Sequence, residues 1–347
     1  MTQPLRTAFR DQGTACAMLG SPFMGRLMPL FAARLQPTSA VARRILEWPG
    51  DVGPGAQSVP LRTAGALHGL VVDGTDAGLV AAYPPNTVND DQLWEAVEAA
   101  FLRHEARIMA WLDQAPQTNE VRRAGALIPA IWWALGQYER PVILSELGAS
   151  GGLNLSLDRF AIEIGARRFG PKDSPVVLQP DWTGSRPVPR DITVTDRAGV
   201  DVNPLDPTDP RGALRLRAFL WPDQPERMAL TEGAIALART GPDPGDAAVW
   251  LEDRLAIRRP GHLHIVYNTI AWQYFPDETQ ARARAALQGA GLRATADAPL
   301  AHIALEGDGD PGGAALTARI WPAPAGQDGP VTLARADYHG RWVDWRV

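Results

Sequence analysis

The stretch VILSELGASGGLNL, residues 142–155, passes from an apolar run into a carboxylate and then into a turn that holds three glycines and a serine. The apolar run is typical of a fully buried strand, and a glycine turn directly after such a strand lets backbone approach a ligand closely. The sequence of this turn fits two kinds of functional site. Residues 146–152 spell ExGxxxG, in which Glu146 holds a nucleoside, and residues 148–152 spell GxSxG, in which Ser150 attacks a carbonyl.

The composition narrows the range of functions. A chain of 347 residues exceeds what one hydrophobic core usually supports, so we expect two domains. The net charge is -5 without a basic block, so nucleic acid and membranes are unexpected partners. A small molecule or a protein is the expected partner, and we predict a small-molecule substrate. Cys16 is the only cysteine, which excludes an internal disulfide and is typical of a reducing compartment.

Targeting signals and lysine chemistry are also missing from the sequence. No run of about 18 apolar residues is present and the first 30 residues carry scattered charges, so we predict a cytoplasmic protein. Lys172 is the only lysine among the 34 Lys and Arg residues. A Schiff-base enzyme or a Walker phosphate loop therefore has almost no residue to use.

The first part of the chain has helical spacing. Within residues 91–114, apolar residues recur three, four or seven positions apart, at Trp94, Val97, Phe101, Ile108 and Trp111. This spacing predicts one amphipathic helix. A second helix is expected over residues 120–138, with Thr118 or Asn119 as its N-cap and a bend at Pro129. We predict that residues 1–137 form an all-α cap domain.

After Pro141 the period changes to short apolar runs separated by helical segments. Strands are expected at 142–147, 191–202, 262–270 and 300–307, helices at 152–160, 214–240, 246–257 and 278–291, and a turn at 241–247. A hairpin is expected within 161–178 and an antiparallel ribbon within 315–345. Alternating strands and helices predict an α/β fold for residues 138–347, a Rossmann-like and mostly parallel sheet with helices on both faces and an antiparallel C-terminal hairpin.

The glycine spacing separates the cofactor hypotheses. A nicotinamide cofactor calls for GxGxxG with glycines at 148, 150 and 153, but Ser150 and Leu153 occupy two of these positions. In methyltransferase-like Rossmann domains a carboxylate stands two residues before the first glycine, as Glu146 does here. Ser150 replaces the second glycine of that pattern. The sequence therefore favours S-adenosylmethionine as the cofactor.

Two other interpretations of the turn remain open. A serine hydrolase needs strands and an HGGG-type loop before its nucleophile elbow and an acid and a histidine after it. Apart from the single strand at 142–147, only helices and no HGG are expected upstream of Ser150, although His264, His302 and His339 follow it. The glycines can also serve simply to let strand and helix pack closely.

Seven segments carry a resemblance to a known family: LGSPFMGRL, QTNEV, ELGASGGLNLSLDRF, RAGVDVNPLD, WPDQPER, IAWQY and YHGRW. They resemble those of a bacterial family catalogued only as a domain of unknown function, and they span nearly the whole chain. The second half of that family is similar to class I methyltransferases in strand order. The resemblance implies an architecture and adds no catalytic residue.

The expected cofactor residues follow the predicted strands: Glu146, Gly148, Ser150, Gly152, Asn154, Asp201 and Asp246. A carboxylate inside an apolar run needs a partner, which is either a ligand's polar groups or an arginine. Asp201, 55 residues after Glu146, either accepts from ribose hydroxyls or initiates the turn NPLDP. Asp246 meets an adenine amino group or caps the next helix, and Asn154 either caps its own helix or touches the ligand.

The expected chemistry lies at the end of the fourth strand and in two turns. Asn268, Tyr274 and His339 are the candidate catalytic residues, and the candidate substrate residues are Gln117, Asn119, Glu120, Arg122, Trp272 and Gln273. Each has an alternative role in packing or capping, as do Asp223, Gln224 and Arg227. His262 and His264 share a strand face without a third ligand, so we expect no metal.

Methyl transfer needs only alignment of the reactants and removal of a proton. Few catalytic residues can therefore be recognised from the sequence. The function we predict is S-adenosylmethionine-dependent methyl transfer to a small molecule. The alternatives are an α/β-hydrolase-type serine hydrolase using Ser150 and a non-catalytic module that binds S-adenosylmethionine or a nucleotide.

Overall fold

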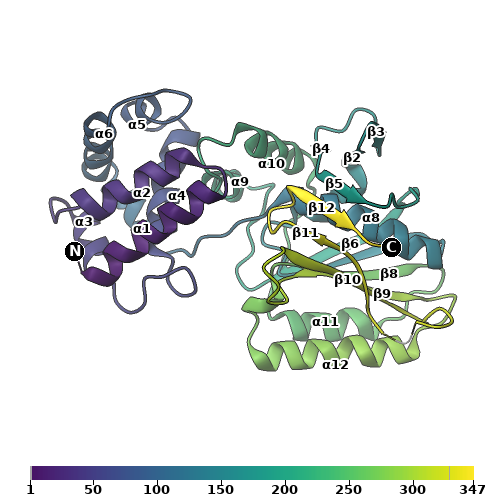
Figure 1. Cartoon of the computed structure of the whole chain (residues 1–347). Coiled ribbons are helices and arrows are strands. Elements are labelled where there is room, and N and C mark those ends of the chain that lie inside the picture. The colour runs from purple at the N-terminus through teal and green to yellow at the C-terminus, as the bar shows by residue number, and fades with distance from the viewer. Residues whose placement is uncertain (1, 328) are drawn as a thin grey trace. The chain divides into compact units, whose positions relative to one another are not determined.

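The computed structural model describes residues 2–327 and 329–347, which form two compact units (Figure 1). The helical unit comprises residues 2–118 and 213–228, and the α/β unit comprises residues 119–212 and 229–347. This division differs from the expected boundary after residue 137. The reason is helix α8 (Ala124–Gln137), which is apolar around most of its surface and packs against the sheet of the α/β unit.

The helical unit is all-α, as the spacing predicts. Its helices are α1 (Gln3–Met18), α2 (Pro22–Arg34), α3 (Ala40–Leu46), α4 (Val59–Val72), α5 (Ala77–Ala82), α6 (Asp90–Arg103) and α7 (Glu105–Leu112). The single helix expected over residues 91–114 is two helices, α6 and α7. They separate at His104, whose backbone leaves the helical conformation and whose Nε2 lies 2.9 Å from Asp76 Oδ2.

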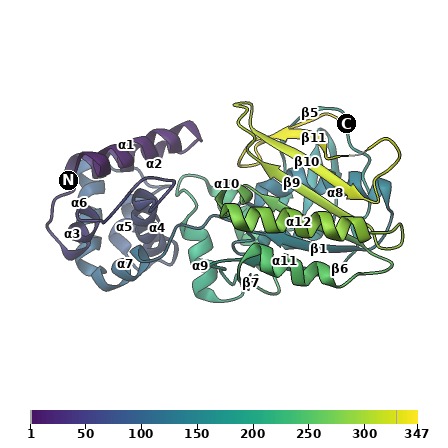
Figure 2. The same ribbon diagram turned by 90° about the horizontal axis from the view of Figure 1, so that it is seen from below.

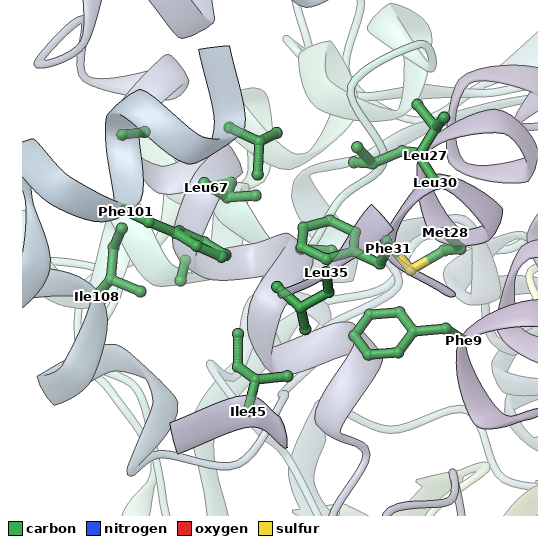
Figure 3. Close-up of a cluster of buried hydrophobic side chains, with 14 of the residues drawn as sticks. Phe9, Leu27, Met28, Leu30, Phe31, Leu35, Ile45, Leu67, Phe101 and Ile108 are labelled. Atoms are coloured by element: carbon green, nitrogen blue, oxygen red, sulfur yellow. The ribbon is translucent and has the colours of Figure 1, made fainter. Parts of the chain in front are cut away.

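Aliphatic side chains and aromatic rings together form the core of the helical unit (Figure 3). The Phe9 and Phe31 rings stack with centroids 5.1 Å apart, and the Phe31 and Phe101 centroids lie 6.1 Å apart. The returning segment 213–228 adds Phe219 to this core. A Cβ at Gly65 would lie 2.5 Å from the Phe219 ring, so α4 needs a glycine where the ring packs.

The motif WPDQPER has a structural role in this unit. Asp223 Oδ2 accepts a hydrogen bond from Phe23 N at 2.8 Å, and Asp223 Oδ1 accepts one from Ser21 Oγ at 2.5 Å. Gln224 Nε2 donates to the carbonyl oxygens of Leu19 and Gly20, each at 3.3 Å. The motif thus binds the turn between α1 and α2, which satisfies backbone groups that helix ends leave without partners.

We expect Asp223→Ala to lower the free energy of unfolding by about 1–2 kcal/mol, because loss of a capping carboxylate typically costs about that much. Denaturant unfolding followed by circular dichroism measures it. Asp11→Ala, at an exposed position of α1, is the control and should leave stability within about 0.5 kcal/mol. Equal effects of the two substitutions would contradict the capping role.

The α/β unit contains a large mixed sheet. Among the described residues it has nine strands in the order β5-β12-β11-β10-β9-β8-β1-β6-β7. Their bounds are β1 (Val142–Leu147), β5 (Asp181–Gly184), β6 (Val194–Asp201), β7 (Asp243–Pro244), β8 (Leu263–Thr269), β9 (Leu300–Glu306), β10 (Ala314–Trp321), β11 (Val331–Ala336) and β12 (Trp342–Trp345). A separate small sheet pairs β2 (Ala161–Ile164) with β3 (Arg167–Phe169) and β4 (Val177–Leu178).

Helices cover the large sheet. Helices α11 (Ala247–Ala256) and α12 (Asp277–Arg293) lie side by side against it (Figures 1 and 2), and α8 packs against β9, β10 and β11. The remaining helices are α9 (Pro210–Ala218), α10 (Pro225–Leu237) and the short 3-10 turns η1 (Val121–Arg123), η2 (Leu153–Arg159) and η3 (Trp272–Tyr274). None of the described helices has both the length and the apolar character needed to cross a membrane.

The mixed α/β architecture and the mostly parallel sheet are confirmed. Three details differ from the expectation. The antiparallel end is a meander of β10, β11 and β12 instead of one hairpin, β7 is a short strand inside the expected turn, and η2 is a 3-10 turn instead of an α-helix. Strands β4 and β7 are each two residues long, and alternation of apolar and polar residues cannot reveal strands of that length.

The order of the parallel strands places a switch point at β1. Beginning with β1, the chain adds β6 and β7 on one side and then crosses to add β8 and β9 on the other. In open parallel sheets, ligands bind beyond the carboxyl ends of the strands at such a reversal. The carboxyl end of β1, between β6 and β8, is therefore where the fold places a candidate site.

Candidate functional site

Glu146 is a buried carboxyl group near the carboxyl end of β1, only 2% exposed. Its Oε2 accepts a hydrogen bond of 3.2 Å from the hydroxyl of Tyr267 on the adjacent strand β8. Burial raises the pKa of Glu146 to about 8, and the nearby negative charge of Asp201 adds to that rise. The Tyr267 hydrogen bond and the positive charge of Arg123 act in the opposite direction. The carboxyl group thus titrates near neutral pH.

The turn after β1 has an unusual backbone. Gly148, Ser150 and Gly152 have φ angles of 67°, 55° and 66°, in the left-handed region that favours glycine. Ser150 adopts it despite its side chain, and its N–H donates to Asp201 Oδ2 at 2.8 Å. A Cβ at Gly148 would lie 2.5 Å from Ala271 Cβ, so the turn packs tightly against the segment after β8.

Two buried side-chain atoms at this turn have no hydrogen-bond partner within the described residues. They are Ser150 Oγ and Asn154 Oδ1, whose residues are 6% and 1% exposed. Buried polar atoms are nearly always satisfied in folded proteins, and leaving one without a partner costs about 1–3 kcal/mol. Asn154 Nδ2 does have a partner, the carbonyl oxygen of Glu120 at 3.2 Å. The two oxygens are therefore hydrogen-bond acceptors that no group among the described residues uses.

The two aspartates predicted to contact the cofactor also organise backbone. Asp201 Oδ1 accepts from Asn203 N at 2.9 Å while its Oδ2 accepts from Ser150 N, so this carboxylate joins the ends of β1 and β6. Asp246 Oδ1 accepts from two N–H groups at the start of α11, and its Oδ2 accepts from Thr279 Oγ1 at 2.6 Å. Asp246 is therefore the N-cap that the alternative interpretation describes.

The segment Asn119–Arg123 lies against the glycine turn. Asn119 Oδ1 accepts from Leu153 N at 2.9 Å, and the Glu120 carbonyl accepts from Asn154. The Glu120 carboxylate accepts from Arg122 Nε at 3.1 Å although it is only 1% exposed. These contacts bring three of the predicted substrate residues together with the predicted cofactor turn. Gln117 precedes the unit boundary and belongs to the helical unit.

A second turn from the end of the chain meets the same segment. Arg123 Nε donates to the Tyr338 carbonyl at 2.8 Å, and Arg123 Nη1 donates to the Thr269 carbonyl at 3.1 Å. Gly340 packs so closely on the Arg122 backbone that a Cβ there would collide with it. His339, a predicted catalytic residue, belongs to this turn, and its N–H donates to Asp337 Oδ1 at 3.0 Å. The turn therefore carries His339 to the segment beside the glycine turn.

Asn268 and Trp272 do not lie on the same side of the sheet as Glu146. Side chains alternate across a strand, and Tyr267 is the β8 residue that faces Glu146, so Asn268 faces the opposite side of the sheet. There Asn268 and Trp272 line a cavity of about 480 Å³ beneath α12. Tyr274 and Gln273 lie in η3 and are exposed, Tyr274 by 71%.

The remaining histidines do not form a metal centre. His264 is buried on β8, where its Nε2 lies 2.8 Å from Ser145 Oγ, whereas His262 is only partly buried and bonds the Pro260 carbonyl. Within residues 2–327 and 329–347, no group of three or more His, Cys, Asp or Glu side chains is arranged to hold a metal ion.

Another cavity, of about 800 Å³, lies at the amino ends of the strands. It is lined by α8, by residues that precede β1 and β6, and by the small sheet, and Trp132 contributes to its wall. Trp132 packs edge-on against Phe169 with ring centroids 5.4 Å apart, which agrees with a packing role for this tryptophan. The position is opposite to the edge at which parallel sheets bind ligands.

Three residues of these sites were missed by the sequence interpretation: Arg123, Tyr267 and Glu306. Tyr267 and Glu306 had a signal, because each places a polar group within an apolar strand near its carboxyl end. Arg123 had none, since its partners are carbonyl groups more than a hundred residues away.

Comparison with known families gives one match. Residues 6–345 fit the family model described as "Uncharacterized protein conserved in bacteria (DUF2332)". The chain belongs to this family. No curated protein and no solved structure matches the chain significantly.

Proposed function

We propose that this DUF2332 protein is an S-adenosylmethionine-dependent methyltransferase that acts on a small molecule and that its α/β unit is a class I methyltransferase-like Rossmann domain. One observation carries the proposal. The Glu146 carboxyl lies at the switch point of the parallel sheet, next to a turn in which Gly148, Ser150 and Gly152 all have positive φ. A turn with left-handed backbone and few side chains lets a nucleoside approach the main chain closely. The acid beside it can pair with a cationic group of the same ligand.

Charge supports S-adenosylmethionine over an anionic dinucleotide. Glu146 and Asp201 end neighbouring strands, and their mutual repulsion contributes to the raised pKa of Glu146. A positively charged ligand beside Glu146 would favour the ionised form of its carboxyl group. S-Adenosylmethionine carries an ammonium group and a sulfonium, from which the transferred methyl group comes. Asn154 Oδ1 and Ser150 Oγ offer acceptors for its donors.

The substrate side of the proposal uses the two segments that meet beside the turn. Asn119, Glu120 and Arg122 approach it from one segment and His339 from the other. We propose that these residues orient the substrate and that His339 takes up a proton. Gln117 belongs to the helical unit and is not part of this proposal. Asn268 and Trp272 are outside it because they face the other side of the sheet.

Titration calorimetry with S-adenosylmethionine and S-adenosylhomocysteine tests the proposal. We expect both to bind the wild-type protein and Glu146→Ala to weaken binding at least tenfold, since a charge-assisted contact contributes about 1.5–3 kcal/mol. The control is Glu252→Gln on the exposed face of α11, where Glu252 pairs with Arg282. Absence of heat with either compound, or equal affinity of Glu146→Ala and wild type, would refute the cofactor assignment.

The hydrolase alternative has one observation in its favour, the positive φ of Ser150 within GxSxG, which is the strained turn that a nucleophile elbow uses. Against it, Ser150 Oγ is buried and lacks a hydrogen-bonded imidazole among the described residues. A fluorophosphonate that labels wild type but not Ser150→Ala would establish the hydrolase. Cofactor binding without methyl transfer to any substrate would instead leave a non-catalytic binding module.

A further inference from the structure

The cavity beneath α12 is a second candidate site, on the side of the sheet opposite to Glu146. Its floor consists of small side chains on two adjacent strands, Ala304 on β9 and Thr317 on β10, which lie directly opposite each other. The volume of about 480 Å³ is within the range that holds a small organic molecule. Larger side chains would fill this space, so the small floor residues keep it open.

A chain of polar groups forms one end of this cavity. His302 Nε2 lies 2.8 Å from Asn268 Oδ1, and Asn268 Nδ2 donates to Glu306 Oε1 at 2.8 Å. Glu306 Oε1 also accepts from the N–H groups of Ala271 at 2.9 Å and Trp272 at 3.0 Å. The other carboxylate oxygen, Glu306 Oε2, is buried and has no hydrogen-bond partner among the described residues. It is an acceptor left available to a donor inside the cavity.

The hydrogen bonds also fix the form of His302. Because the Asn268 amide donates to Glu306, its oxygen faces His302, and His302 Nε2 must donate. Burial lowers the pKa of His302 to about 4, so the imidazole is neutral at physiological pH. The positive charges of the cavity therefore come from its arginines alone.

Two arginines supply that charge. The Arg319 guanidinium lies 4.8 Å from the centroid of the Trp321 ring, and that of Arg284 lies 5.3 Å from the centroid of the Trp272 ring. Within residues 2–327 and 329–347, neither arginine forms a salt bridge with a carboxylate, although Arg284 donates to Gln280 Oε1. A guanidinium placed over an aromatic ring can still offer its N–H groups to a planar anion.

We propose that this cavity binds a small organic acid whose carboxylate pairs with Arg319 and whose hydroxyl or amino group donates to Glu306 Oε2. Arg319 lies opposite His302 in the strand register, and Glu306 is four residues further along β9, about 13 Å away. Both side chains line the same cavity, and its volume has room for a ring that carries an acid at one end and a donor at the other. This site is independent of the proposed methyltransferase site.

Titration of the whole protein with benzoate and with 4-hydroxybenzoate tests the proposal, because the two probes differ only in the donor. We expect 4-hydroxybenzoate to bind more tightly than benzoate. Arg319→Gln should weaken both at least tenfold, and Arg319→Lys should give an intermediate loss. Glu306→Gln keeps the acceptor for Ala271 and Trp272 but replaces the free acceptor with a donor, so it should remove the preference for 4-hydroxybenzoate.

Two further variants test whether the probes bind inside this cavity. Arg293→Gln, on α12 outside the cavity, should change neither affinity, and Ala304→Leu should abolish binding of both probes by filling the floor. Thermal unfolding of each variant checks that it folds. The proposal fails if neither probe binds at millimolar concentration or if Arg319→Gln binds as wild type does. It also fails if inorganic phosphate binds as well as 4-hydroxybenzoate and Glu306→Gln changes nothing, which would make the cavity a simple anion site.

Discussion

Gly148→Ala is expected to lower the free energy of unfolding by about 2–5 kcal/mol and to abolish binding of S-adenosylmethionine. A side chain at φ 67° costs about 1–2 kcal/mol, because its Cβ crowds the carbonyl oxygen. The new Cβ would also lie 2.5 Å from Ala271 Cβ, and such overpacking typically costs about 1–3 kcal/mol. The backbone shift that relieves the clash would move the turn that faces the proposed cofactor. Denaturant unfolding and calorimetry measure the two effects.

Two further variants separate the causes. Gly261 has φ 76°, and a Cβ at this position would have no neighbouring atom within 4 Å, so Gly261→Ala should show only the conformational cost of about 1–2 kcal/mol. The double variant Gly148→Ala/Ala271→Gly removes the steric overlap and should recover part of the stability relative to Gly148→Ala. If Gly148→Ala costs no more than Gly261→Ala, the close approach to Ala271 does not constrain the turn.

The sequence predicted the parts of the fold that depend on local pattern. The apolar run before Glu146, the glycine turn after it and the alternation of strands with helices are local signals, and they yield β1, its turn and a mostly parallel sheet. Ser150 in this turn and Asp201 at the carboxyl end of β6 lie together, because Ser150 N donates to Asp201 Oδ2. Their proximity follows from the rule that the ends of parallel strands share one edge.

Contacts between segments far apart in the chain could not be predicted from the local sequence pattern. Residues 213–228 read as part of a helical crossover in the α/β half, yet Phe219 packs on Gly65 and Asp223 caps α2 in the helical unit. Nothing within the segment itself identifies partners about 150–200 residues away. The unit boundary was therefore placed from the change in periodicity, which follows secondary structure and not packing.

The sequence pattern also does not predict which face of the sheet the side chain of Asn268 occupies. Asn268 is a candidate catalytic residue because the sequence places it at the end of a buried strand, and it does lie near the end of β8. Alternation shows that Tyr267 and Asn268 face opposite sides, but which of them faces Glu146 depends on the register between β1 and β8. Register is set by packing across strands, so the sequence could place Asn268 at the right edge without placing it on the right face.

The raised pKa of Glu146 connects the candidate site to the stability of the protein. An unfolded glutamate titrates near 4.5, whereas burial, with a contribution from Asp201, raises the pKa in the folded protein to about 8. Between these values the folded chain holds a proton that the unfolded chain has lost. The free energy of unfolding must therefore fall as pH rises through this window, and the fall is complete once the pH exceeds the folded pKa of about 8.

We expect wild type to lose about 2 kcal/mol of stability relative to Glu146→Gln between pH 6.5 and 8, since each pH unit across the window changes the difference by about 1.4 kcal/mol. The glutamine still accepts the Tyr267 hydrogen bond but cannot ionise. His68 and His302, with pKa values lowered to about 4, and His264, lowered to about 3, stay neutral in this range. Their stabilising contributions are lost only as pH falls below about 6.5, so they do not overlap with the effect of Glu146.

Denaturant unfolding of wild type, Glu146→Gln and Glu252→Gln at half-unit pH steps measures this dependence. The exposed Glu252 is the matched control, and its variant should follow the wild-type profile. Parallel profiles of wild type and Glu146→Gln from pH 6.5 to 8 would show that Glu146 is already ionised in the folded protein at pH 6.5. In that case a nearby positive charge, such as that of Arg123, would outweigh the cost of burial, and the site would need no cationic ligand to neutralise it.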